Sequence, residues 1–181
     1  WVMRDIAPMM GIAAPAILTN LATPVGNTYA MRIFASFGEE TVAAFAIIDR
    51  IAPVAFGVLF ALTGSIGPII GQNFGAGLYD RIRRAMLDCF AVSAVYVLVV
   101  WFLLWLAGPA IAAIFDAQGA TRELVLFFCA VGSAAWLALA GLFVANAAFN
   151  NLGFPILATV FNWGRATLGT IPFVTYGAHR W

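Results

Sequence analysis

Hydrophobic residues run along this chain in long stretches that charged side chains rarely interrupt. Residues 6–31 carry no charge, and neither do residues 124–164. A helix rises about 1.5 Å per residue, so about 20 apolar residues cross a hydrocarbon core of roughly 30 Å. The pattern predicts an all-α integral membrane protein with about five transmembrane helices in a single domain, 1–181. We expect the spans at about residues 6–34, 41–72, 84–115, 124–149 and 155–178.

The boundary between the second and third spans lies in a stretch that changes from apolar and glycine-rich to arginine-rich. Gly75 and Gly77 can adopt the positive φ that a tight helix exit requires. The arginines at 81, 83 and 84 end the apolar pattern and are expected in water on the cytoplasmic side. The last boundary falls before Pro155, because proline disfavours a helical residue in front of it.

Polar side chains follow one face of the first predicted span. Asn20, Thr23 and Asn27 are spaced i, i+3 and i+7, which places them on one helical face. Such a stripe inside a membrane turns toward protein or a water-filled cavity rather than lipid. Two readings remain open, hydrogen bonds to a neighbouring helix and the lining of a cavity.

Similar faces occur on the last two spans. Phe143, Asn146 and Asn150 share a face of the fourth span, and Trp136 adds an aromatic ring to it. Asn162 is spaced i, i+3 from Arg165 on the fifth, where a cation is costly and should face a cavity, a carbonyl or a carboxylate. The predicted cavity residues are Asn20, Thr23, Asn27, Trp136, Phe143, Asn146, Asn150, Asn162 and Arg165.

Composition supports a bilayer environment and excludes several functions. The 181 residues are 64% hydrophobic and 9% charged, against about 25% charged in soluble domains. The net charge of +1 and the lack of lysine give no sign of nucleic-acid binding. No metal-ligand spacing or nucleotide-binding fingerprint is present, so we expect neither an enzyme nor a bound cofactor. Cys89 and Cys129 are interpreted as small buried apolar residues.

Asp49 and Arg50 interrupt the second span early. Adjacent residues on a helix point about 100° apart, so they are poorly placed to pair with each other. They could reach the headgroups or pair with other helices, and structural use is the preferred interpretation. Helices interrupted by proline and glycine, with polar stripes at membrane depth, indicate a transporter rather than a channel.

Residues 67–77, GPIIGQNFGAG, and the following YDR resemble the segment after the eighth span of multidrug and toxic compound extrusion (MATE) transporters. The matching positions are Gly71, Gln72, Asn73, Gly75, Gly77, Asp80 and Arg81. Residues 146–155 and 162–166 resemble the tenth and eleventh spans of the same family. The resemblance implies part of a six-helix C-terminal lobe, spans seven to eleven of twelve, whose N-terminal lobe belongs to the same polypeptide.

The resemblance also implies a function. It is that of a multi-pass antiporter of the bacterial inner membrane, which exports cationic or amphipathic compounds in exchange for H⁺ or Na⁺ by alternating access. One branch of the family carries coupling carboxylates on spans seven and ten, but residues 6–31 and 124–164 contain no acid. The coupling acid is then expected in the N-terminal lobe, with Asp49 as the other possibility. A lipid-linked sugar flippase and a nonfunctional membrane fragment remain alternatives.

Overall fold

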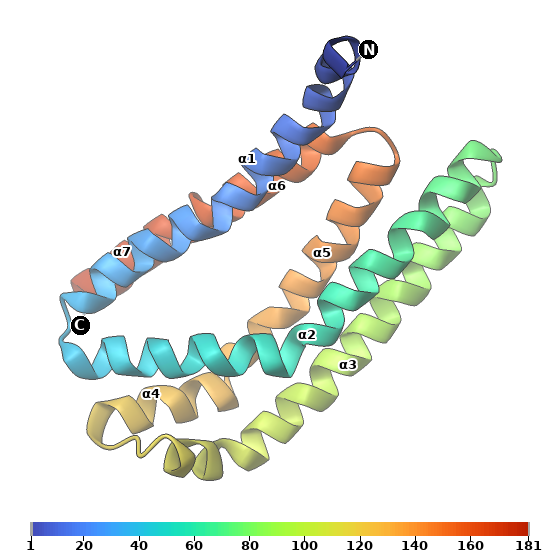
Figure 1. Cartoon of the computed structure of the whole chain (residues 1–181). Helices are drawn as coiled ribbons and strands as arrows, with labels where there is room; N and C mark the ends of the chain where they lie inside the picture. Colours follow the sequence, from blue (N-terminus) through green and yellow to red (C-terminus); the bar gives the residue numbers. More distant parts are fainter. Residues whose placement is uncertain (1, 181) are drawn as a thin grey trace.

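The computed structural model describes residues 2–180, and every regular element in that range is helical, which confirms the all-α prediction (Figure 1). The elements are α1 (Val2–Ala35), α2 (Glu39–Gly75), α3 (Tyr79–Ile114), α4 (Gly119–Ala130), the 3-10 helix η1 (Gly132–Ala135), α5 (Trp136–Asn151), α6 (Pro155–Ala166) and α7 (Ile171–Arg180).

Three of the described helical segments are long and apolar enough to cross a bilayer. They are α2, α3 and Gly132–Asn151, with mean hydropathies of 2.0, 2.4 and 1.5. Large apolar side chains remain exposed on these segments, including Val54, Phe102 and Ile114. Acyl chains can cover such faces without the cost that water would impose. The exposed surface is therefore that of a membrane protein.

The fourth predicted span is divided rather than continuous. Helix α4 ends at Ala130, and Val131 leaves the helical region at φ −129° and ψ −48° before η1 begins. Gly132 follows, and glycine is a poor helix former. The indole Nε1 of Trp101 donates a hydrogen bond to the Ala130 carbonyl at 2.8 Å, which satisfies an acceptor at the break.

The fifth predicted span is also divided, at residues 167–170. The Thr167 hydroxyl donates to the Trp163 carbonyl at 2.6 Å, and the Thr170 hydroxyl donates to the Arg165 carbonyl at 3.0 Å. Such local bonds compete with the helical ladder. The result is two short helices, α6 with 12 residues and α7 with 10, instead of one long rod.

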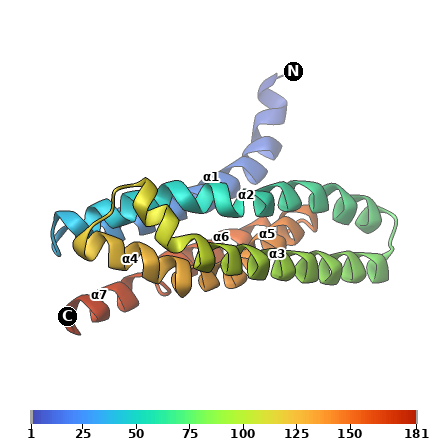
Figure 2. The same cartoon turned by 90° about the horizontal axis from the view of Figure 1, so that it is seen from below.

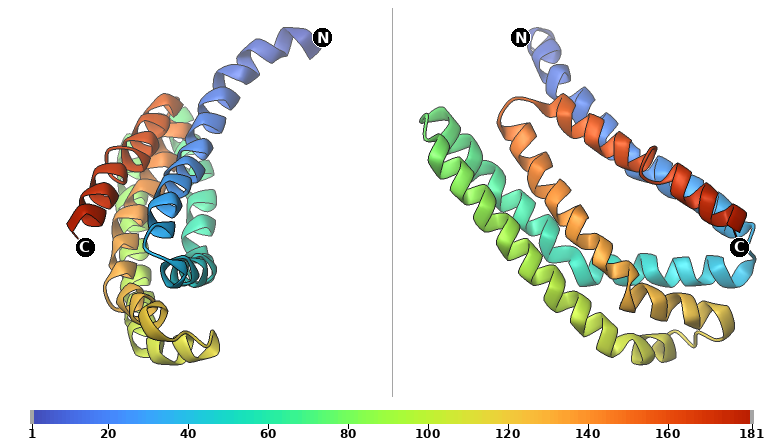
Figure 3. Two further views of the ribbon diagram at one scale, coloured as in Figure 1. Left: turned by 90° about the vertical axis from the view of Figure 1, so that its left-hand side faces the viewer. Right: turned by 180° about the vertical axis from the view of Figure 1, so that it is seen from behind.

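The helices form two groups with different partners. Helix α1 lies alongside α6 and α7, whereas α2, α3, α4 and α5 pack with one another (Figures 1 and 3). Near the turn at 152–154, α5 and α6 converge, and they diverge toward the other end, where the first part of α2 crosses between them (Figure 1). The first turns of α1 point away from the other helices (Figure 2).

The apolar core lies in the group formed by α2 to α5. Phe56 and Leu59 of α2 pack with Val97 of α3 and Val125 of α4, and all four are almost fully buried. Cys129 belongs to the same cluster and is a free thiol. Close packing of this kind makes the group a rigid wall for the space beside it.

The turn between α2 and α3 corrects one detail of the sequence interpretation. Gly77 has a φ of 71°, but Gly75 stays in the last turn of α2 and does not have positive φ. Helix α3 begins at Tyr79, so residues 81–84 with the three arginines are already helical. One glycine is enough for the reversal, because the Gly77 amide donates back to the Phe74 carbonyl at 3.0 Å.

Candidate functional site

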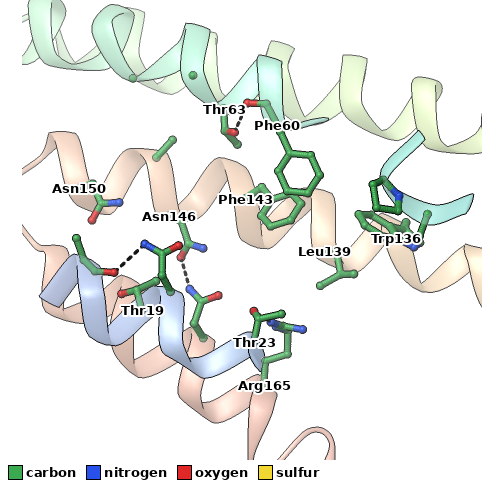
Figure 4. A pocket seen from close by; sticks show the side chains of 18 of the residues that line it. Thr19, Thr23, Phe60, Thr63, Trp136, Leu139, Phe143, Asn146, Asn150 and Arg165 are labelled. Carbon is green, nitrogen blue, oxygen red and sulfur yellow. Dashed lines mark hydrogen bonds between the residues drawn. The ribbon is translucent and has the colours of Figure 1, made fainter. Parts of the chain in front are cut away.

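A cavity of about 1000 Å³ opens between α1, α2, α5 and α6, where the two helix groups diverge. Figure 4 shows α2 along one side, α5 across the middle, and α1 with α6 along the other side. All nine side chains predicted to line a cavity line this one: Asn20, Thr23, Asn27, Trp136, Phe143, Asn146, Asn150, Asn162 and Arg165. Predicted residues from three helices, α1, α5 and α6, therefore meet at one space.

The wall formed by α1 and α6 is held together by polar side chains. The hydroxyl oxygens of Thr19 and Thr159 lie 2.8 Å apart, and both are within bonding distance of the Pro15 carbonyl, at 2.8 and 3.0 Å. The indole of Trp163 donates to the Leu18 carbonyl at 2.9 Å. Hydrogen bonds between helices stabilise packing inside a membrane, where lipid offers no alternative partners.

Among the described residues, the asparagines of the predicted stripe on α1, Asn20 and Asn27, do not bond to α6 as Thr19 does. The Asn20 amide nitrogen donates to the Ala16 carbonyl of its own helix at 2.9 Å. Asn20 and Asn27 are exposed along the cavity. Of the two interpretations left open by the sequence, the structure thus favours cavity lining for these amides. The side-chain bonds to α6 come instead from Thr23 of the stripe and from Thr19, which the sequence stripe did not include.

One amide pair joins α5 to α6 across the cavity wall. The Asn162 nitrogen donates to the Asn146 side-chain oxygen at 3.0 Å and to the Ala158 carbonyl at 2.8 Å. Asn162 is buried, whereas Asn146 is half-buried and Asn150 is exposed along the cavity. The pair fixes the Asn146 side chain beside the open space.

Arg165 lies on the cavity and bonds to a hydroxyl rather than to a carbonyl or carboxylate. Its Nη2 donates to the Thr23 Oγ1 at 2.7 Å, so a cation of α6 contacts the stripe of α1 (Figure 4). Its Nε is buried and has no hydrogen-bond partner among the described residues. A guanidinium with spare donors can bind an anionic or carbonyl group of a solute.

Aromatic rings form the opposite side. Phe60 of α2 and Phe143 of α5 lie with ring centroids 5.1 Å apart at 44° (Figure 4). Trp136 stacks on Phe56 at 4.4 Å and 11° and also lines the cavity. Such faces bind flat apolar molecules and attract organic cations. Phe60 was missed from the sequence, although it lies on the cavity-facing side of α2.

Asp49 was not among the cavity residues predicted from the sequence. It lines the cavity, whereas Arg50 lines an apolar groove of about 480 Å³ between α2 and α3. The two neighbours thus face different sides of α2. Among the described side chains, no ion pair or hydrogen bond holds the Asp49 carboxylate, so the preferred structural pairing is not observed. The spacing of Asp49 from Pro53 and Phe60 could have indicated the shared face.

The glycine-rich motif lies away from the cavity, at the end of α2 and the start of α3. Its members are Gly71, Gln72, Asn73, Gly75, Gly77, Asp80 and Arg81. The Asn73 amide donates to the Ile69 carbonyl at 2.8 Å, and a Cβ on Gly71 would lie 3.6 Å from the Asn151 side chain. The motif therefore shapes the turn and its contact with α5. In the part of the chain that the structure describes, no group of three acidic, histidine or cysteine side chains could hold a metal ion.

Comparison with known proteins places the chain among membrane transporters. The sequence model of the MatE family matches residues 15–175. A protein of Pseudomonas savastanoi, described as an uncharacterized 21 kDa protein in the iaaL 5′ region, is 37% identical over 177 residues, which are 97% of this chain and 58% of that protein. No solved structure matches the chain significantly.

Two further relatives have functional names. An FAD transporter of Shewanella oneidensis is 29% identical over 168 residues, which are 93% of this chain and 37% of that protein. A probable multidrug resistance protein NorM of Bradyrhizobium diazoefficiens is 35% identical over 82 residues, which are 45% of this chain and 18% of that protein. The chain thus spans less than two thirds of the length of each relative.

Proposed function

The chain belongs to the MatE family of membrane transporters, and from that premise we propose that it forms part of an exporter of cationic or amphipathic small molecules. The exporter would work by exchange with H⁺ or Na⁺. Members of this family are transporters and not enzymes, and the apolar helices agree with a place in a membrane. The bacterial inner membrane is the location we propose.

The observation that carries this proposal is the cavity between the two helix groups. Its volume of about 1000 Å³ is large enough for a drug-sized molecule, since ligand pockets commonly measure about 300–1,000 Å³. Amides and hydroxyls line the α1 side, whereas the α2 and α5 side combines aromatic rings with the polar side chains of Asp49, Asn146 and Asn150. A solute with both polar and apolar groups therefore finds suitable contacts in the cavity.

The proposed mechanism is alternating access between two lobes of one polypeptide. The packed group of α2 to α5 would move as a unit, because its core is closely packed. A second lobe, supplied by the longer chain that the relatives have, would close the open side of the cavity. Acyl chains of the bilayer would cover the exposed apolar faces of α2 and α3.

Accumulation of a fluorescent cation tests the proposal. The complete polypeptide that contains this chain would be expressed in a bacterium that lacks its own efflux pumps, with membrane insertion confirmed by immunoblot. We expect lower steady-state ethidium fluorescence than in cells with an empty vector. Dissipating the proton and sodium gradients should abolish the difference. Equal accumulation in both strains, with the protein inserted, would refute cation export.

A flavin nucleotide is the second candidate substrate, because one specific observation favours it. The FAD transporter relative aligns with 93% of this chain, and Arg165 places a cationic side chain on the cavity. Flavin in the growth medium, measured by its fluorescence, separates the two candidates. A lipid-linked sugar flippase is less well supported, since its pyrophosphate would call for a more cationic lining and Arg165 is the one arginine among the described cavity residues.

A further inference from the structure

Two ionisable side chains line the cavity among the described residues, Asp49 of α2 and Arg165 of α6. Each belongs to a different helix group. Arg165 donates to the Thr23 hydroxyl of α1, whereas no described side chain bonds to the Asp49 carboxylate. The cavity thus contains one acid that is open to a solute.

A proline close to Asp49 leaves one main-chain carbonyl of α2 without its usual helical partner. Pro53 lies four residues later in α2 and also lines the cavity. Proline has no amide hydrogen, so the helical bond that would normally reach the Asp49 carbonyl cannot form. Main-chain carbonyls freed in this way, together with carboxylates, are common ligands of cations in interrupted transmembrane helices.

Asp49 is exposed along the cavity, ten residues after Glu39 at the start of α2, which corresponds to about 15 Å along the helix axis. An acid on a membrane-crossing helix usually has a cation or a wet cavity as its partner. Trp136 of α5 lines the same cavity and offers a ring face that attracts cations.

We propose that Asp49 is the residue at which this cavity binds a monovalent cation, either the exported organic cation or the coupling ion. The inference rests on the proposed cation export and names the group that would perform it. Binding one kind of cation neutralises the carboxylate, so H⁺ or Na⁺ competes directly with the organic cation. The two ions cannot occupy one carboxylate together, so binding of either one excludes the other.

Equilibrium binding to the purified full-length protein in lipid nanodiscs tests the assignment. The probes are ethidium, followed by fluorescence, and ²²Na⁺, followed by scintillation proximity. Asp49→Asn is compared with Asp49→Glu, which keeps the charge, and with Asp88→Asn, the same chemical change at an exposed site of α3 outside the cavity.

We expect Asp49→Asn to weaken the binding of ethidium, of sodium or of both by about tenfold or more, as loss of a charged partner usually does. Asp49→Glu should retain binding within about threefold, and Asp88→Asn should match the wild type. In the wild type, added Na⁺ should displace ethidium. In Asp49→Asn this competition should disappear, which a merely structural role would not produce.

The outcomes separate this inference from the proposed function. If the wild type binds and exports ethidium but Asp49→Asn behaves like Asp88→Asn, the assignment of Asp49 is wrong and cation export stands. If the wild type binds neither cation and binds FAD instead, both fail. A third result would also overturn the assignment. If Asp49→Asn and Arg165→Gln lower thermal stability equally, and the double variant recovers it, Asp49 serves as the partner of Arg165.

Discussion

The contact between α1 and α6 depends on small residues, and enlarging one of them should push the two helices apart. Gly26 of α1 faces Ala166 of α6, and Ala22 and Ala158 are also fully buried in these two helices. Small side chains let helix backbones approach closely in membranes. We predict that Gly26→Leu loosens this wall, whereas the same change at Gly57 of α2 does not.

The magnitude follows from the contacts of an added Cβ. At Gly26 it would lie 3.3 Å from the Ala166 Cβ, 3.3 Å from the Ala166 carbonyl oxygen and 3.4 Å from the Ala166 Cα. Comfortable carbon contacts are about 3.5–4.0 Å, so two backbone atoms would have to move even for alanine. Leucine adds three more carbons, and overpacking of this kind costs about 1–3 kcal/mol. At Gly57 an added Cβ meets nothing within 4 Å.

Thermal unfolding in detergent micelles, followed by size-exclusion chromatography with fluorescence detection, measures the difference. A loss of about 2 kcal/mol corresponds to a fall in Tm of about 4–8 °C for a chain of this size. Gly57→Leu should remain within about 2 °C of the wild type, because glycine is the weaker helix former and no clash results. If the two variants melt at the same temperature, the close approach of α1 and α6 does not contribute to stability.

Two further substitutions test other parts of the fold by the same measurement. Gly77→Ala should lower stability by about 1–2 kcal/mol because alanine is strained at a φ of 71°, whereas Gly75→Ala should be neutral; equal effects would contradict the single-glycine turn. Tyr96→Phe should cost about 1 kcal/mol by removing the hydrogen bond to the Ala55 carbonyl at 2.7 Å, whereas Tyr79→Phe on the exposed start of α3 should change nothing.

The fold class and the cavity residues could be predicted because both depend on patterns that the bilayer enforces. Uncharged stretches have few alternatives to helices when water is absent. Polar side chains at i, i+3 and i+7 on α1 must share a face. Because lipid offers them no hydrogen-bond partners, that face turns toward the protein. The position of Asn20, Thr23 and Asn27 on the cavity could therefore be predicted from their spacing alone.

The breaks within the fourth and fifth spans could not be predicted in the same way. Hydropathy averages over a window and does not change when a helix is interrupted for a few residues. The interruption after Ala130 is compensated by Trp101 from α3, a contact between distant parts of the chain. The interruption at 167–170 involves threonine hydroxyls that bond backward along their own segment, and threonines also occur within unbroken helices.

The side of α2 on which Asp49 lies could not be predicted for a different reason. The sequence indicated that Asp49 and Arg50 point in different directions, and it left headgroup contact, pairing with other helices and, for Asp49, coupling as possibilities. Because adjacent helical positions differ by about 100°, a wall helix sends one to the cavity and the other to the outer groove. Which face is which depends on where α5 and α3 pack against α2, and that information lies in the tertiary structure.

The two ionisable side chains of the described cavity lie on different walls. Asp49 belongs to the group of α2 to α5, and Arg165 is held on the group of α1 and α6 by Thr23. The groups converge at the turn 152–154 and diverge toward the other end. If the proposed transport involves a change in the separation of these walls, a solute that contacts both would bind more tightly when they are close, and it would therefore shift the equilibrium toward the narrower form.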